Sequence, residues 1–228
     1  MSDESIIKLD AVTVNQKNKL VLENVDLDIK SGEFVYLIGK TGSGKSSLLQ
    51  ILYADLELNV GEGHVCGFNL NTLKRHEIPF LRRKLGIVFQ DFQLLEDRDV
   101  EQNFKFVLKA TGWKDKNEID QRILEVLEQV EMIDKLKVMP HRLSGGEQQR
   151  IAIARSLLNH PEVILADEPT GNLDPETSNG IMKLLLKICE SGKTVIMATH
   201  NYNIIHKFPG KIIKCEDGLV INSANKLN

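Results

Sequence analysis

Apolar and polar residues alternate in short segments over the first thirty positions of the chain. Segments 6–14 and 19–29 carry this alternation, and the polar stretch NQKNK lies between them. Alternation of this kind is typical of strands with one buried face, and short polar links usually join antiparallel neighbours. The pattern therefore predicts an antiparallel β-sheet at the start of the chain.

A short apolar run follows, and the pattern then changes to a helical period. Residues 33–38 read EFVYLI, which is typical of a buried strand, and glycine ends the run. In the segment KSSLLQILYADL, residues 45–56, leucines recur at helical spacing at positions 48, 49, 52 and 56. The sequence predicts a buried strand, a glycine-rich loop and a helix in direct succession.

The middle of the chain, from about residue 91 to residue 140, has a helical pattern of its own. Five apolar residues share one face of a predicted helix: Ile119, Ile123, Val126, Leu127 and Val130. Two apolar runs, 162–166 and 193–199, then flank the helical segment 178–190. This order of strand, helix and strand implies a parallel sheet. The pattern after residue 210 predicts a hairpin and a polar tail.

Together these elements predict one α/β unit over residues 1–228 with a mainly parallel sheet at its core. We expect an N-terminal antiparallel β-subdomain within a core of about 1–90 and 141–228, and a helical subdomain of about 91–140. The length and the 42% hydrophobic content are sufficient for one buried core of this size.

The charge and the cysteines narrow the class of partner. A net charge of −3 lacks the basic excess that sequence-independent binding to DNA or RNA requires, so no nucleic acid is expected as a partner. The three cysteines are widely spaced and fit a reducing cytoplasm. The N-terminus has no secretory pattern, and no apolar run approaches the roughly 20 residues that span a bilayer. Any membrane association is expected to depend on a partner.

The loop GKTGSGKS, residues 39–46, matches the phosphate-binding pattern G-x-x-x-x-G-K-[ST] between a predicted strand and a predicted helix. In such loops backbone N–H groups turn towards phosphate oxygens, and the helix start adds its positive dipole end. Lys45 is expected to reach the β- and γ-phosphates of ATP, and the Ser46 hydroxyl to bind Mg²⁺. A dinucleotide-binding pattern fails because no glycine follows Gly44 three residues on. The predicted ATP-binding residues are Gly39, Lys40, Thr41, Gly42, Ser43, Gly44, Lys45, Ser46 and Ser47.

Two carboxylates end the apolar run VILADE, residues 163–168. Asp167 is placed to hold Mg²⁺ through its water shell, and Glu168 can orient and deprotonate an attacking water. Downstream of a phosphate-binding loop this pair favours hydrolysis of a nucleoside triphosphate. The rival function is a clamp in which ATP only holds two subunits together, and such a clamp could lack Glu168.

The segment LSGGEQQRIAIARSLL, residues 143–158, resembles the signature motif of the ABC-type ATPases, and the resemblance covers nearly the whole chain. In this segment Ser144, Gly145 and Gly146 open a predicted helix whose N–H groups can hold a phosphate. The resemblance implies the P-loop NTPase fold of ABC type and a homodimer in which each ATP lies between the P-loop of one subunit and the signature of the other. The contacts that it implies in trans are Ser144, Gly145, Gly146 and Glu147.

The same resemblance implies roles for three single residues. Gln90 is expected to bind Mg²⁺ and the attacking water, and His200 to contact the γ-phosphate, so both join Glu168 as catalytic residues. The implied metal ligands are Ser46, Gln90 and Asp167. Asp174, in the stretch GNLD, is expected at the dimer seam, although as a bare sequence this stretch is only a turn.

The sequence departs from the family at the adenine. Cassettes of this family normally stack an aromatic side chain of the first strands on the base, and here no aromatic residue or histidine precedes Phe34. Val14, Asn15 or Gln16 occupies the expected region. Because a flat π-face contributes about 1 kcal/mol or more, we expect weaker or less base-selective binding.

Two segments, EIPFLRRKLGIVFQDFQLLEDRDVEQN and ILADEPTGNLD, are most similar to the FtsE group of bacterial cell-division ATPases. This implies an FtsX-like integral membrane partner, a peripheral place at the cytoplasmic face of the bacterial inner membrane, and ATP-driven activation of cell-wall hydrolases. The second segment is shared with lipoprotein-release and MacB-like export ATPases, which are the alternative. Phe92, Leu94 and Leu95 could receive a helix of the partner or be ordinary core, and the basic run 82–84 could face lipid, partner or solvent.

Overall fold

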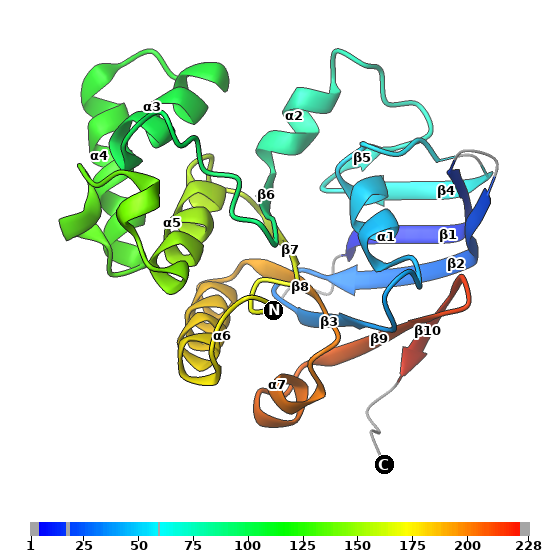
Figure 1. The fold of residues 1–228 in the computed structure, drawn as a ribbon. Coiled ribbons are helices and arrows are strands. Elements are labelled where there is room, and N and C mark those ends of the chain that lie inside the picture. The colour runs from blue at the N-terminus through cyan, green and yellow to red at the C-terminus, as the bar shows by residue number, and fades with distance from the viewer. Residues whose placement is uncertain (1–4, 17–18, 59, 224–228) are drawn as a thin grey trace.

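A computed structural model of the chain describes residues 5–16, 19–58 and 60–223, and it contains two β-sheets with helices between and around them (Figure 1). The first sheet is antiparallel throughout, with the strand order β2-β1-β4-β5. Its strands are β1 (Ser5–Gln16), β2 (Lys19–Lys30), β4 (Val60–Val65) and β5 (Phe68–Asn69). The predicted antiparallel start of the chain is confirmed.

The second sheet has six strands in the order β10-β9-β3-β8-β7-β6, and all neighbours are parallel except β10 and β9. Its strands are β3 (Phe34–Ile38), β6 (Leu85–Val88), β7 (Val163–Asp167), β8 (Thr194–Thr199), β9 (Lys211–Glu216) and β10 (Leu219–Ser223). The parallel pair β7 and β8, joined by α6 (Pro175–Glu190), confirms the predicted unit of strand, helix and strand. The predicted final hairpin is also confirmed, and the polar tail after residue 223 lies outside the described residues.

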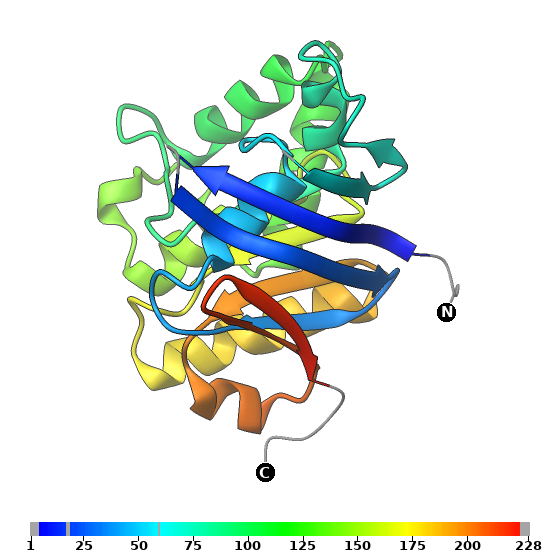
Figure 2. The same ribbon diagram turned by 90° about the vertical axis from the view of Figure 1, so that its right-hand side faces the viewer.

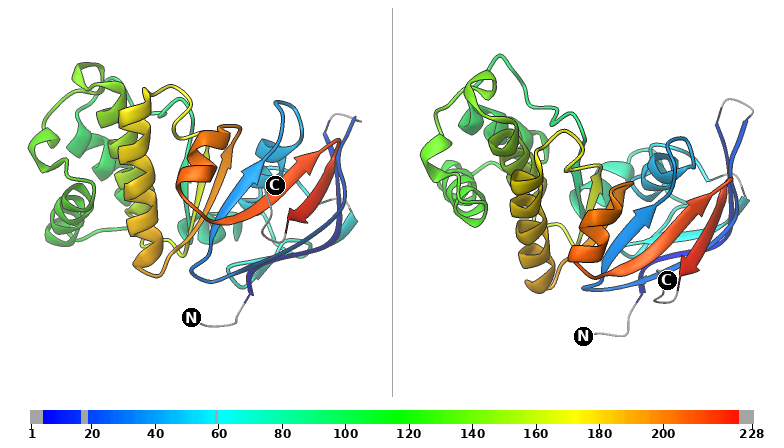
Figure 3. Two further views of the ribbon diagram at one scale, coloured as in Figure 1. Left: turned by 90° about the horizontal axis from the view of Figure 1, so that it is seen from below. Right: turned by 60° about the horizontal axis from the view of Figure 1, so that its bottom comes forward.

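The parallel strands are buried on both faces, as their continuous apolar runs require. In β3, Val35 and Leu37 pack with α1 (Lys45–Leu52) and the antiparallel sheet, whereas Phe34, Tyr36 and Ile38 pack on the other side. Helix α1 therefore lies between the two sheets, behind β1 and β2 in Figure 2. The opposite face of the six-stranded sheet is covered by α5 (Gly145–Leu157), α6 and α7 (Tyr202–Lys207), as Figure 3 shows.

The region between residues 91 and 140 is helical and stands apart from the sheets (Figure 1). It contains α3 (Val100–Ala110), α4 (Lys116–Gln129) and two 3₁₀ turns, Ile133–Lys135 and Pro140–Arg142, and α2 (Ile78–Arg83) precedes it. The five apolar residues predicted to share a helical face are all buried. The limits of the helical subdomain stay a prediction. In the described part of the chain, no helix has the length and apolar character needed to cross a bilayer.

Helix α1 is shorter than the leucine spacing predicts. It ends at Leu52, and Ala54 follows with a left-handed φ of 53°. The Ala54 N–H donates to the Ile51 carbonyl oxygen at 2.9 Å. A left-handed residue just after a helix stops the helical hydrogen-bond ladder, so the predicted extension to Leu56 is wrong. Leu56 is half-buried beyond the helix and still packs against the core between the sheets.

Candidate functional site

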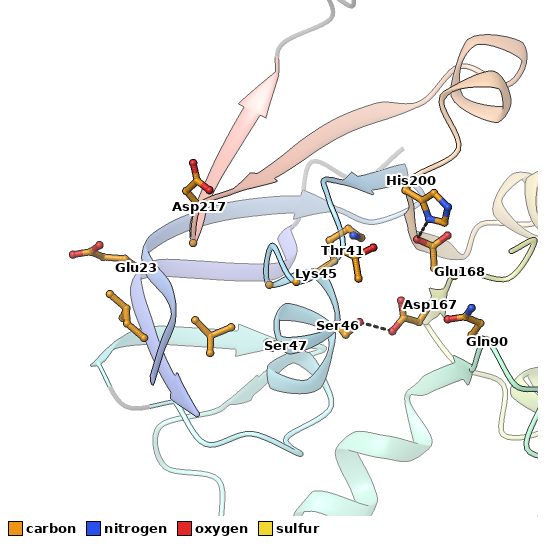
Figure 4. A pocket seen from close by; sticks show the side chains of 15 residues that line it. Glu23, Thr41, Lys45, Ser46, Ser47, Gln90, Asp167, Glu168, His200 and Asp217 are labelled. Atoms are coloured by element: carbon orange, nitrogen blue, oxygen red, sulfur yellow. Dashed lines mark hydrogen bonds and ion pairs between the residues drawn. The ribbon is translucent and has the colours of Figure 1, made fainter. Parts of the chain in front are cut away.

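A cleft of about 750 Å³ opens where β3, β7 and β8 end (Figure 4). The loops that follow parallel strands meet at one edge of a sheet, and this is where such folds bind ligands. The cleft brings together predicted residues from four separate segments: Thr41, Gly42, Gly44, Lys45, Ser46, Ser47, Gln90, Asp167, Glu168 and His200. The other predicted P-loop residues, Gly39, Lys40 and Ser43, line a neighbouring cavity of about 290 Å³.

The loop after β3 wraps around the ammonium group of Lys45. Lys45 Nζ donates to the carbonyl oxygens of Gly39 at 2.8 Å and of Lys40 at 3.1 Å. Gly44 precedes α1 with a φ of 100°, and a Cβ there would lie 2.7 Å from Leu22 Cδ2. Both observations restrict this position to glycine. The first turn of α1 then faces the cleft with free N–H groups, which stabilise an anion.

Ser46 and Asp167 meet in the cleft, where Ser46 Oγ donates to Asp167 Oδ2 at 2.8 Å. Burial is the main cause that raises the pKa of Asp167 above its ordinary value, and the hydrogen bond from Ser46 and the charge of Lys45 act in the opposite direction. A hydroxyl beside a carboxylate is the oxygen donor set that Mg²⁺ prefers. A dication there would favour the charged carboxylate, so this pair fits Mg²⁺.

Glu168 and His200 form a second pair in the cleft, with His200 Nδ1 2.7 Å from Glu168 Oε1. The Glu168 side chain is mostly buried, whereas the His200 side chain is 64% exposed. Glu168 has a left-handed φ of 47°, a strained conformation that the surrounding structure must hold in place. A Cβ on Gly171 would lie 3.6 Å from both the Gln90 amide nitrogen and Glu168 Cβ. Gln90 and Glu168 therefore both border Gly171 and line the same cleft.

The signature segment lies outside this cleft. Ser144 is the N-cap of α5 and forms a capping box with Glu147, whose Oε2 accepts from the Ser144 N–H at 2.8 Å. This N–H, together with Lys135 at 3.0 Å, lowers the pKa of Glu147. Gly145 and Gly146 form the first turn of α5. Its free N–H groups can hold an anion, but none of the four residues 144–147 lines the cleft.

Asp174 lies outside the cleft as well. It is the N-cap of α6, and its Oδ1 accepts from the N–H groups of Glu176 and Thr177, both at 3.0 Å. Its described contacts are therefore those of a helix cap, and its place at a dimer seam stays a prediction.

The ABC transporter family profile matches residues 22–171. The chain belongs to the ABC transporter family. It is 42% identical over 223 residues to the cell division ATP-binding protein FtsE of Streptococcus pneumoniae, which covers 97% of this chain and 96% of that protein. It is 44% identical over 205 residues to FtsE of Bacillus subtilis, covering 90% of each, and 41% identical over 197 residues to FtsE of Escherichia coli, covering 86% and 88%.

Solved ABC cassettes share the fold. The ATP-binding cassette MJ0796, in a dimeric post-hydrolysis state bound to ADP and Pi, matches with a TM-score of 0.83 and 37% identity over 96% of this chain and 100% of that chain. CbiO1 of Clostridium perfringens, part of the ABC transporter complex cbiONQ, matches with a TM-score of 0.87 and 32% identity over 96% and 88%. The predicted ABC fold and the assignment as an ATP-hydrolysing ABC ATPase are confirmed.

No aromatic side chain of the described residues lines the cleft of this ABC ATPase. Glu23 of β2 and Asp217 lie at the end away from Asp167 (Figure 4), and Leu20, Val21 and Gly218 also line the cleft. Sequence reasoning missed these residues because no motif marks them. The signal that could have found them is strand register, since Leu20 pairs with Asn15.

Of the three residues predicted as alternatives for the adenine region, Val14 is excluded, because it is fully buried in the core between the sheets. Asn15 is exposed, and the side chain of Gln16 lies outside the described residues.

Proposed function

We propose that this ABC ATPase works as a homodimer that binds two ATP molecules and is the nucleotide-binding subunit of an FtsE-like membrane complex. The observation that carries the proposal is one cleft in which the Ser46–Asp167 pair and the Glu168–His200 pair flank a phosphate-binding loop. The link to cell division rests on the FtsE relatives, which are 41% to 44% identical over most of the chain.

The P-loop binds the triphosphate of ATP. Lys45 exchanges its two neutral carbonyl acceptors for β- and γ-phosphate oxygens, because these carry negative charge and attract the ammonium group more strongly. Ser46, Asp167 and Gln90 would hold Mg²⁺, which neutralises charge on the phosphates when bound. The N–H groups of the loop and of the first turn of α1 surround the remaining oxygens.

Glu168 acts as the general base. Its carboxylate orients a water and accepts the proton as the water oxygen attacks the γ-phosphorus. The bond from this phosphorus to the β–γ bridging oxygen breaks, and ADP leaves with the electron pair of that bond. His200 keeps Nδ1 on Glu168 and contacts the γ-phosphate through Nε2, so the carboxylate also sets the orientation of the ring. Gln90, in the same cleft as Glu168, positions the same water.

The second half of each site comes from the partner copy. The first turn of α5 can bind an anion, but it does not line the ATP cleft of its own subunit. A two-fold dimer would place this turn over the ATP of the other subunit. Ser144, Gly145 and Gly146 then contact the γ-phosphate. Glu147 is a charged acceptor that would repel a triphosphate, so we assign to it the ribose hydroxyls, which can donate. Asp174 lies at the seam.

The membrane partner docks in a second hollow. A groove of about 360 Å³ is lined by apolar side chains that include Phe89, Leu95, Phe106 and Val107. Phe106 is 53% exposed even though the Arg98 guanidinium lies 5.1 Å from its ring centroid, so part of its apolar surface is open to a partner. A cytoplasmic helix of an FtsX-like integral membrane protein fits such a groove and would hold the ATPase at the cytoplasmic face of the bacterial inner membrane. Leu94 packs against the core instead.

The basic run 82–84 receives no lipid role. Arg82 Nε donates to the Tyr53 carbonyl oxygen at 2.9 Å, and Lys84 pairs with Glu162 at 2.7 Å. Two of its three charges are therefore bound by the chain itself.

The test is to tag the Glu168→Gln variant, trap it with ATP and Mg²⁺ in native membranes, and identify the integral membrane protein that purifies with it. Lys45→Ala is the matched control, because it should not hold ATP. A partner with a large extracytoplasmic domain and a link to wall hydrolases supports the division role. If a lipoprotein-release or export permease purifies instead, the ATPase mechanism stands and the proposed role in cell division is replaced by a role in export.

The role of Glu168 has a separate test in the purified protein. We expect Glu168→Gln to lose turnover and to keep ATP-dependent dimerisation. Unchanged turnover in this variant would falsify the role given to Glu168.

A further inference from the structure

The segment between β6 and α3 has a strained backbone just after Gln90. Phe92 and Gln93 have left-handed φ angles of 58° and 50°, although neither is glycine. The Gln93 N–H donates to the Asp91 carbonyl oxygen at 2.6 Å. Residues with a Cβ rarely adopt this conformation, and two in succession persist only where their surroundings impose it.

Arg155 of α5 holds this turn. Its Nη2 donates to the Phe92 carbonyl oxygen at 2.8 Å, and its Nη1 donates to the Gln93 carbonyl oxygen. The planar guanidinium presents rigid parallel donors, which suit two adjacent acceptors better than an ammonium group does. Burial lowers the pKa of Arg155, with the charge of Asp91 acting in the opposite direction. The arginine is thus a desolvated cation whose side chain is committed to this backbone.

Both ends of the segment are anchored by other residues. On the cleft side, the Gln90 carbonyl oxygen accepts from Asn172 Nδ2 at 3.4 Å. On the far side, Asn103 brackets Leu95, accepting from its N–H at 2.8 Å and donating to its carbonyl oxygen at 3.0 Å. Between these anchors, the backbone of residues 91–94 also accepts hydrogen bonds from a side chain. Among the described residues, that side chain is Arg155 alone.

We propose that Arg155 is a positioning residue for ATP hydrolysis, which fixes the turn at Phe92 and Gln93 and thereby holds Gln90 in the cleft with Glu168. Arg155 and Gln93 also line the apolar groove, so the same turn connects the groove to the ATP cleft. The inference rests on the role proposed above for Gln90.

The experiment measures hydrolysis against Mg²⁺ concentration at saturating ATP in purified full-length protein, together with binding of a fluorescent ATP analogue in EDTA. The variants are Arg155→Lys, Gln90→Ala and the double variant. Arg122→Lys is the matched control: Arg122 is buried, whereas Arg155 is half-buried, and it too donates to two carbonyl oxygens, those of Leu157 and Leu158, but away from Gln90. Gln93→Pro breaks the turn from the other side, because proline cannot adopt a φ of 50°.

We expect Arg155→Lys and Gln93→Pro to bind the analogue in EDTA like the wild type. Both should lower kcat about tenfold or more and raise the half-activating Mg²⁺ concentration several-fold, as Gln90→Ala does. The double variant should be no worse than Gln90→Ala alone, because residues that act through one group are not additive. Arg122→Lys should lose thermal stability with kcat within about twofold of the wild type.

Each contrary result has a distinct meaning. If Arg155→Lys and Gln93→Pro keep wild-type Mg²⁺ activation while Gln90→Ala loses it, the inference is overturned and the proposed function stands. Additive losses in the double variant overturn it too, since Arg155 would then act on another group. If Gln90→Ala itself behaves like the wild type, the role of Gln90 falls and the inference falls with it. Should Arg155→Lys fail to fold, Gln93→Pro alone decides.

Discussion

Ser144→Ala separates two tasks that one hydroxyl is expected to perform. In the single chain, Ser144 Oγ caps α5 by accepting from the Glu147 N–H at 3.3 Å. Loss of an N-cap costs about 1 kcal/mol. For a chain of 228 residues, 1 kcal/mol corresponds to a fall in Tm of about 2–4 °C. The long cap distance places the expected loss at the lower end of that range.

In the single chain this hydroxyl donates to Glu147 Oε2 at 2.9 Å, and in the ATP dimer it would donate instead to the γ-phosphate of the ATP bound by the other subunit. A hydrogen bond to a charged group contributes about 1.5–3 kcal/mol, and a two-fold dimer contains two of them. Their loss removes about 3–6 kcal/mol of association free energy. At 1.4 kcal/mol per factor of ten, dimerisation should weaken roughly 10²- to 10⁴-fold. Ser144→Ala should therefore affect dimerisation far more than folding.

The assay is sedimentation of the dimer with ATP and Mg²⁺ in the Glu168→Gln background, and Tm is measured on the same proteins. Asp115→Ala is the matched control, because Asp115 caps α4 by accepting from Asn117 N–H at 2.7 Å and Glu118 N–H at 3.0 Å. We expect a loss of Tm in both variants, larger in Asp115→Ala because its two cap bonds are shorter, and a weakened dimer only in Ser144→Ala. Equal dimerisation of the two would refute the contact in trans.

Three further substitutions and one comparison of nucleotides test other groups. Burial raises the pKa of Asp167, so its charge costs stability as pH rises through the folded pKa. Asp167→Asn should therefore raise the Tm of the nucleotide-free protein at pH 7 and abolish Mg²⁺-dependent hydrolysis. An unchanged Tm contradicts this expectation. The pKa of Glu147 is lowered, so its stabilisation is lost below its ordinary value of 4.5, and Glu147→Gln should flatten the acid side of the urea midpoint profile. Gln149 is fully buried and both side-chain polar atoms lack a partner in the described chain, so Gln149→Met should stabilise by about 1–3 kcal/mol in denaturant titration, and destabilisation would show that the amide is satisfied. Because no Phe, Tyr or Trp of the described residues lines the cleft, ATP and GTP should compete for it about equally. A strong preference for ATP would show that other residues recognise the adenine.

The phosphate end of the cleft could be predicted from sequence because its residues lie in contiguous motifs at strand ends. Gly44 shows why the motif is local. Its φ of 100° and the nearby Leu22 side chain disfavour any residue with a Cβ, so glycine at this one position indicates the conformation of the loop. The same holds for Asp167 and Glu168, which follow directly from a buried strand. Chemistry that depends on consecutive residues is visible in a single sequence.

The base end and the turn after Gln90 could not be predicted, because both depend on residues far apart in the chain. Leu20 reaches the cleft through its pairing with β1, and a shift of one residue in that register would change which side chains face the nucleotide. Arg155 contacts carbonyls 62 and 63 residues earlier, and no local pattern marks that contact. The early end of α1 at Ala54 has no propensity signal either, since alanine rarely adopts a left-handed φ.

Helix α5 connects these distant features, and its rigidity has a thermodynamic consequence. Its 13 residues span about 20 Å, from the Ser144 cap past Arg155 to carbonyls that Arg122 of α4 holds. A displacement of the groove that moves the turn at Arg155 should therefore also move the signature end, which we propose contacts ATP in the dimer. If a membrane partner in the groove strengthens ATP-dependent dimerisation by some factor, ATP must strengthen binding of that partner by the same factor. The free energy that ATP-dependent dimerisation can transmit to the partner is limited to the difference in the partner's binding free energy between the two states of the dimer.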